Sequence, residues 1–293
     1  MLRATEDAVD ALARLDEQVA SAAPGFATLL MLRSAQAIVA ANDRPLGSAR
    51  TDDSPDGDAG FAALLGWWYA PTSREFITDD PHLRGTALAL DAAADMMCAG
   101  RPLTLGLLEE ALHTADVALG ELPDAFDETL RIAEMEVWPP LLLCAELSSG
   151  TGGQLRSIPA SIARAVAPLA SGLTTGVFVT AGCADTQASA LHMVAREARV
   201  MRRRVMTYRE ECAQAAARCS EFGRGGASAQ ALVGLLAKRP AVTVAAVASA
   251  LDLTAPTAGA AVERLVGARL LREITGRARD RVFVYTPAVT LAG

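Results

Sequence analysis

Three arginines crowd one short turn near the end of the chain, in the sequence Gly276-Arg-Ala-Arg-Asp-Arg. Apolar residues alternate on either side of this turn, which predicts a β-hairpin whose tip carries Arg277, Arg279 and Arg281. A guanidinium binds phosphate oxygens strongly, and nothing apolar in the turn requires such side chains. These residues therefore favour phosphate binding. A solvated hairpin in a small protein–protein module is the alternative.

The segment before the hairpin must position these arginines. Its pattern predicts helices over 229–236 and 244–251, a brief extended piece near 239–243, and a third helix ending near 268. In the turn before the third helix, Thr254 is a predicted N-cap, and Pro256 stands just inside the helix. Three helices and a basic hairpin are the layout of a winged helix-turn-helix, in which one helix enters the major groove and the hairpin lies along phosphate.

The candidate DNA-binding residues come from the third helix and from the hairpin. They are Thr254, Thr257, Arg264, Arg272, Arg277, Arg279 and Arg281. The start of the helix otherwise offers only small residues, so phosphate contacts should dominate and sequence readout should be modest. The expected partner is double-stranded DNA. A homodimer is also expected, because one small module rarely binds tightly at physiological salt.

Charge is distributed unevenly along the chain. The whole sequence carries −7, whereas residues 228–293 contain eight lysines and arginines against four acids, a net charge of +4 that leaves −11 for residues 1–227. DNA contact is therefore expected from a local patch only. We expect a helical domain over 1–222, a Gly-rich linker over 223–227 and the winged helix-turn-helix over 228–293.

The first 222 residues are expected to be mainly helical. Apolar residues make up 51% of the chain and aromatic residues only 4%, a mix that favours closely packed helices. The run Trp67-Trp68-Tyr69 is interpreted as core anchors, with a ligand platform as the alternative. Helices are predicted over 5–21, 26–41, 81–97, 105–119, 123–136, 158–170 and 191–220, with a buried helix after Trp138 and a polar loop over 42–58.

Composition also bears on location and on metals. The five cysteines lack C-x-x-C pairing and the three histidines are spread widely, so no zinc site is expected. Free thiols favour a reducing compartment, and acids stand where a signal peptide would be apolar. The longest uncharged stretch, 165–184, is interrupted by proline and glycines. We therefore expect a cytoplasmic protein without a membrane partner.

A second motif lies between two predicted helices of the first domain. Its sequence, Ser149-Gly-Thr-Gly-Gly, precedes a helix, where backbone N–H groups bind anions. A glycine-rich turn between packed helices is the alternative. The nucleotide- or anion-binding candidates are Gly150, Thr151, Gly152, Gly153 and Arg156.

The C-terminal segment resembles the winged helix appended to many bacterial Fic-family proteins, over Pro240–Ala258 and Leu271–Tyr285. Fic proteins are helical enzymes that transfer AMP from ATP to a target hydroxyl, with the signature H-P-F-x-[D/E]-G-N-G-R-x-x-R. If the resemblance extends upstream, residues 145–156 align with that signature, and Gly150, Gly152 and Arg156 agree with it. The resemblance implies a Fic-like helical bundle, mainly α, followed by the winged helix-turn-helix with its β-hairpin wing.

The departures from the signature fall on its chemistry. The base histidine is replaced by Ala145, the metal-binding acid by Ser149 and the asparagine by Thr151. Loss of a positioned base costs roughly 10² to 10⁴ in rate, and loss of the acid removes the magnesium anchor. We therefore expect no catalytic residue, metal or cofactor, and a DNA-binding transcriptional regulator with a silent Fic-like domain. The alternatives are a divergent nucleotidyl or AMP transferase that uses ATP and magnesium at the Gly150–Arg156 loop, and a protein-binding adaptor.

Overall fold

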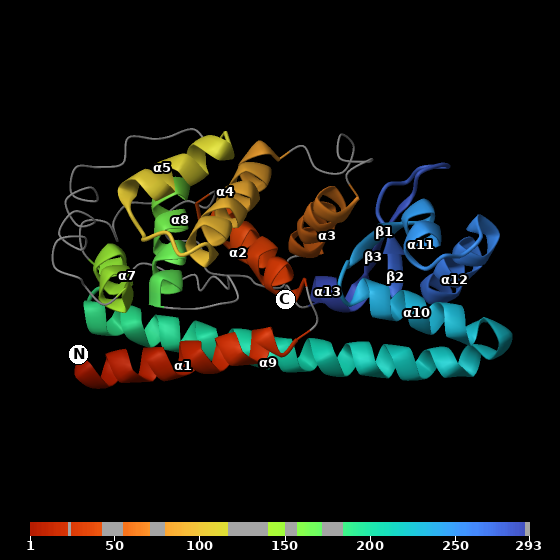
Figure 1. Cartoon of the computed structure of the whole chain (residues 1–293), viewed down its shortest axis with the longest axis horizontal. Coiled ribbons are helices and arrows are strands. Elements are labelled where there is room, and N and C mark those ends of the chain that lie inside the picture. Colours follow the sequence, from red (N-terminus) through yellow and green to blue (C-terminus); the bar gives the residue numbers. More distant parts are fainter. Residues whose placement is uncertain are drawn as a thin grey trace. The chain divides into compact units, whose positions relative to one another are not determined.

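A computed structural model describes residues 1–22, 25–42, 55–70, 80–116, 140–149, 157–171 and 184–290 of the chain. These residues fold mainly into helices, with one small sheet (Figure 1), which confirms the expectation of a mainly α protein. The predicted helix over 123–136 and residues 43–54 of the predicted polar loop lie outside the described residues.

The chain divides into two compact units. The first comprises Met1–Ala22, Ala27–Ser48 and Pro81–Arg203, and the second comprises Ala23–Phe26, Ala49–Asp80 and Arg204–Gly293. This differs from the expected division at 223–227: the boundary falls inside one long helix, and the segment with Trp67 groups with the C-terminal part. Local sequence signals such as glycines do not show that the helix containing Trp67, far away in sequence, packs against the C-terminal sheet.

The helices lie close to their predicted positions. They are α1 (Leu2–Ala20), α2 (Phe26–Asn42), α4 (Pro81–Cys98), α5 (Leu105–Thr114), α7 (Pro140–Ser149), α8 (Ile158–Val166) with the 3₁₀ turn η3 (Ala167–Ser171), and α9 (Gln187–Cys219). In the first unit, α4 packs against α5 and α8, and α7 packs against α1 and α8. Many buried positions are alanines, for example Ala8, Ala87 and Ala93, which allow helices to approach closely.

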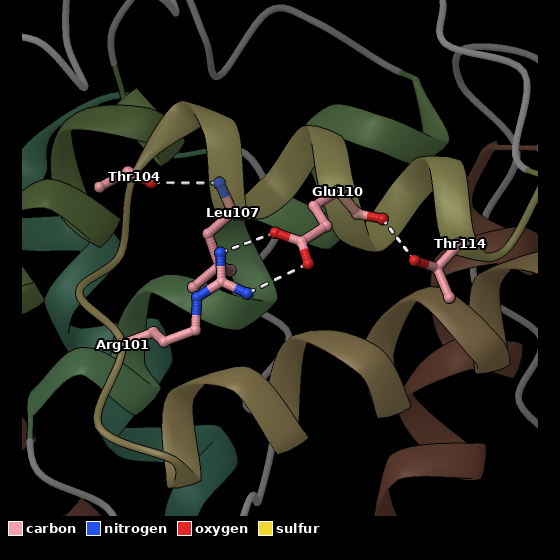
Figure 2. A network of polar contacts seen from close by, with 5 residues as sticks. All are labelled: Arg101, Thr104, Leu107, Glu110 and Thr114. Atoms are coloured by element: carbon pink, nitrogen blue, oxygen red, sulfur yellow. Dashed lines mark hydrogen bonds and ion pairs between the residues drawn. The ribbon is translucent and has the colours of Figure 1, made fainter.

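Side chains of the connection between α4 and α5 bind to α5, and a further hydrogen bond lies at the far end of that helix (Figure 2). The Thr104 hydroxyl accepts a 3.1 Å hydrogen bond from Leu107 N–H and caps α5. Arg101, in the connection, donates to both carboxylate oxygens of Glu110 at 3.1 and 2.6 Å. Thr114 in turn donates to the Glu110 carbonyl at 2.7 Å. The Thr104 cap and the Arg101–Glu110 ion pair thus tie the connection to α5.

The second unit contains the C-terminal elements and α3. They are α3 (Pro55–Tyr69), η4 (Ser220–Gly225), α10 (Gly226–Leu236), β1 (Ala241–Thr243), α11 (Val244–Ala250), α12 (Ala255–Gly267), β2 (Leu271–Glu273), β3 (Val282–Tyr285) and α13 (Thr286–Thr290). The sheet has the order β1-β3-β2 and is antiparallel throughout, with Val242 and Glu273 both facing Phe283. The predicted hairpin, extended piece and three helices are all present.

Helix α3 packs against β1, β3 and α13. Trp67 is buried, and its ring meets that of Trp68 edge-on, with 5.8 Å between centroids. Tyr285 of β3 and Tyr208 of α9 are buried too, with ring centroids 6.3 Å apart. Trp67 thus contributes to the core of the second unit, in line with its interpretation as a core anchor, whereas Trp68 and Tyr69 are half-buried.

Gly223, Gly225 and Gly226 lie in a 3₁₀ helix and at the start of α10, where the sequence predicted a Gly-rich linker over 223–227. Residues 220–225 are a 3₁₀ helix that leads directly into α10, with Gly223 at a φ of 61°. A side-chain carbon on Gly226 would come within 2.6 Å of the Cys219 carbonyl oxygen. Glycine is therefore favoured at 223 by the positive φ and required at 226 by the close backbone approach.

Candidate nucleic-acid interface

Helices α11 and α12 are joined by a short turn that sets their relative direction. The Thr243 hydroxyl caps α11 by accepting from Ala246 N–H at 3.1 Å. The helix ends where Asp252 adopts a φ of 51° and Leu253 N–H donates to the Ala248 carbonyl at 2.9 Å. The axes of α11 and α12 differ in direction by 115°. This lies within the range of about 90–120° that helix-turn-helix motifs adopt.

Taken together, α11 and α12 have the length and apolar composition of a membrane span, broken at this bend. Among the described residues, no single helix has that length and composition.

The first turn of α12 is exposed. Thr254 accepts a 3.4 Å hydrogen bond from Thr257 N–H, as predicted for the N-cap, and the two hydroxyls lie 2.8 Å apart. Ala255 and Pro256 between them are exposed as well. The opposite face of the helix is buried and includes Ala258, Ala261 and Leu265. The sequence thus places Thr254 and Thr257 on a surface that a partner can reach.

Arg264 lies elsewhere than expected. It is exposed, but its guanidinium covers Gly225, so that a side-chain carbon on Gly225 would overlap it. Nearby in the fold, Arg218 Nη2 donates to the Ala268 carbonyl at the end of α12, at 3.3 Å. Two arginines therefore hold α12 to the end of α9 and the turn after it. The structure brings Arg264 to this junction rather than to the exposed first turn.

The hairpin turn is organised by Glu273, at the end of β2. Its carboxylate accepts from the N–H groups of Thr275 at 2.6 Å and Gly276 at 3.0 Å, and from the Thr275 hydroxyl. Thr275 Oγ1 accepts from Val282 N–H at 3.2 Å and so links the carboxylate to the opposite strand. Burial opposes ionisation of Glu273, but these hydrogen bonds and the Arg281 charge outweigh it and hold its pKa below the ordinary value.

The arginines of the hairpin are held differently from one another. Arg281 Nη2 donates to Glu263 Oε1 of α12 at 3.0 Å, and its guanidinium lies 5.2 Å from the centroid of the Phe283 ring. Arg277 is half-buried, while Arg272 and Arg279 are exposed. Both sides of the Arg281–Glu263 ion pair are accessible, with side chains 43% and 58% exposed.

The structure therefore brings six of the seven predicted residues to the exposed turn of α12 and the hairpin, with Arg264 at the junction before α10. Sequence reasoning assigned no role to Glu263 or Glu273. The only signal for Glu273 is its place just before a Thr-Gly turn, where a carboxylate can accept backbone N–H bonds. No local signal identifies the ion pair of Glu263, since its partner Arg281 comes from another element.

The second predicted motif is described only at its start. Gly150, Thr151, Gly152, Gly153 and Arg156 lie outside the described residues. Of the aligned catalytic positions, Ala145 is fully buried in α7, and the Ser149 hydroxyl donates to the Ala145 carbonyl at 2.8 Å. The Ser149 hydroxyl is thus used within its own helix. Within the described ranges, no cluster of three or more His, Cys, Asp or Glu side chains could hold a metal ion.

No family model matches this chain, and no curated protein matches it. The resemblance to Fic proteins therefore stays a prediction from residues 145–156 and the C-terminal segment. The geometry of the second unit is the basis for assigning a function.

Proposed function

We propose that this protein binds double-stranded DNA through α12 and the β2–β3 hairpin and acts as a transcriptional regulator. The observation that carries the proposal is the arrangement of α10, β1, α11, α12, β2 and β3, with the sheet order β1-β3-β2 and 115° between α11 and α12. This is the layout of a winged helix-turn-helix, in which the second helix of the pair enters the major groove.

The chemistry of the surface supports the same proposal. Residues 228–293 carry a net charge of +4 in a chain whose total is −7. Arg272 and Arg279 are exposed and Arg281 is ion-paired with Glu263, all on a hairpin whose turn is braced by Glu273. A rigid basic hairpin keeps its charges in register with phosphates, and each neutralised phosphate releases counterions.

We propose for the first unit a Fic-like helical domain that is catalytically silent and that supports a homodimer, in a cytoplasmic protein. The support for silence comes from the residues at the aligned positions. Alanine at 145 offers no proton acceptor, and the Ser149 hydroxyl is a weaker magnesium ligand than the carboxylate it replaces. Dimerisation is supported by the small size of a single winged helix-turn-helix surface.

The test is fluorescence anisotropy of the full-length protein with random and upstream genomic duplexes, over a range of salt concentrations. In the hairpin variant, alanine replaces Arg277, Arg279 and Arg281. In the control variant, alanine replaces three exposed arginines elsewhere in the chain, which are Arg3, Arg14 and Arg209. We expect wild-type binding to weaken steeply with salt. For the hairpin variant, the slope of log binding constant against log salt concentration should become shallower by up to about 0.9 for each phosphate contact removed.

Two results would overturn the proposal. One is an absence of binding even at about 50 mM salt, where non-specific affinity should be strong. That result would favour a protein-binding adaptor. The other is a hairpin variant that binds as tightly as the control variant, which would place the DNA surface elsewhere. Incubation with labelled ATP and magnesium tests the silent domain, since label on the protein or on lysate proteins would contradict it.

A further inference from the structure

Helix α12 is poor in side chains that could read a base by paired hydrogen bonds. Between Ala255 and Gly267 its only charged residues are Glu263 and Arg264. Glu263 is ion-paired with Arg281 of the hairpin, and the guanidinium of Arg264 covers Gly225. Bidentate contacts to guanine or adenine need Arg, Lys, Asn or Gln, and α12 presents none of these at its exposed start.

The two threonines at that start are largely occupied with each other. Thr254 Oγ1 accepts the Thr257 N–H, and the two hydroxyls share a hydrogen bond, so only one O–H is left between them. Their side chains are nevertheless exposed, as are Ala255, Pro256 and Ala260. Apart from that one O–H group and the remaining oxygen lone pairs, this surface offers a partner a cluster of methyl and methylene groups.

Of the four bases, only thymine presents a methyl group in the major groove. Against an apolar helix end, that methyl is buried favourably, at about 0.8 kcal/mol per carbon group. In the major groove a G·C pair instead presents two hydrogen-bond acceptors of guanine and the amino group of cytosine. Against carbon atoms these groups would lose their hydrogen bonds to water and gain none in return. The same apolar contact thus favours A·T pairs with thymine correctly placed and disfavours G·C pairs.

We infer that the exposed first turn of α12 reads thymine methyl groups, so that this protein prefers A·T-rich duplex and makes the distinction in the major groove. The inference rests on the proposed DNA-binding function and names the class of sequence that the surface takes. The arginines of the hairpin supply affinity that is independent of sequence, while Thr257 and its neighbours supply the preference.

Four duplexes of about 20 base pairs separate the possible sources of such a preference. The first is A·T-rich, and the second replaces its thymines by uracil, which removes only the methyl groups. The third replaces its A·T pairs by inosine·cytosine, which keeps the A·T pattern of the minor groove but presents a G·C-like major groove. The fourth is G·C-rich. Each is titrated into the full-length protein at one fixed salt concentration, by anisotropy.

We expect uracil to weaken binding about threefold to fourfold for each methyl contacted, and the inosine duplex to bind as weakly as the G·C duplex. In Thr257→Ser, which keeps the hydroxyl and loses the methyl, the ratio between thymine and uracil duplexes should fall toward one. Thr243→Ser, the same change at the cap of α11, is the matched control and should keep the wild-type ratio.

The outcomes are distinguishable. Equal, salt-dependent binding of all four duplexes would overturn this inference and leave the proposed function standing. Tight binding of the inosine duplex with no effect of uracil would also overturn it, because the preference would then come from the minor groove. Failure to bind any duplex at low salt would remove both the inference and the proposed function.

Discussion

The guanidinium of Arg281, at the end of the hairpin turn, donates a 3.0 Å hydrogen bond to the carboxylate of Glu263 on α12. The pair joins the two elements that we propose to contact DNA, and both of its members are exposed. A phosphate that binds Arg281 must therefore compete with Glu263. The carboxylate also places a negative charge where DNA would approach.

We expect Glu263→Gln to bind DNA more tightly than the wild type. The change frees Arg281 and removes a like charge from the surface, so affinity should rise several-fold at low salt and the salt slope should steepen by up to about 0.9. Stability should change little, because an exposed ion pair contributes about 0–1 kcal/mol. Anisotropy titrations at several salt concentrations measure both quantities.

Glu210→Gln is the matched control for that variant, since Glu210 is an exposed glutamate of α9 and the change in net charge is the same. We expect it to bind like the wild type. If both variants gained affinity equally, the effect would belong to net charge, and Glu263 would have no special position.

The second prediction concerns pH. Because the pKa of Glu273 is lower in the folded protein, its stabilising contribution is present above its unfolded pKa and is lost as the pH falls through the folded value. Glu273→Gln should cost about 1–2 kcal/mol at pH 7, from loss of charge-assisted hydrogen bonds to Thr275 and Gly276. The difference in free energy of unfolding between Glu273→Gln and the wild type should shrink below about pH 4.5, the ordinary pKa of glutamate.

This difference is measured by urea unfolding at a series of pH values. Replacing Trp138 by phenylalanine leaves Trp67 and Trp68 as the only tryptophans, and both lie in α3, in the same compact unit as the hairpin. A difference that stayed constant from pH 7 to below pH 4 would contradict an ionised Glu273 as the brace of the turn.

The third prediction concerns the start of α12. Thr254→Ala should destabilise the second unit by about 0.5–2 kcal/mol, because the Thr257 N–H loses its side-chain acceptor. Thr254→Ser keeps a capping oxygen and should stay close to the wild type. Urea unfolding in the same tryptophan background measures both. Equal loss in the two variants would mean that the threonine methyl, and not the cap, carries the effect.

The fourth prediction compares two neighbouring glycines. Gly226→Ala would bring a carbon against the backbone carbonyl of Cys219, which cannot easily yield, so we expect a loss of about 1–3 kcal/mol. In Gly225→Ala the three nearest atoms to the new carbon all belong to the flexible Arg264 side chain, which can swing aside, so a loss well under 1 kcal/mol is expected. Urea unfolding midpoints report both. Two neutral substitutions would support the flexible linker that the sequence first indicated.

Short-range signals were enough to predict most elements of the second unit. The N-cap at Thr254, the helix that follows it and the hairpin around Gly276 agree with the structure, because caps, turns and apolar periodicity act within a few residues. The local charge of residues 228–293 likewise follows from composition alone.

Tertiary structure alone decided how the site is completed. It placed Glu263 opposite Arg281, laid Arg264 across Gly225 and packed α3 against the sheet. Each of these contacts joins residues from different elements, so it depends on how those elements pack together in the fold. The sequence therefore determined the elements and their charges, whereas long-range packing determined which side chains bind one another and which lie exposed at the surface.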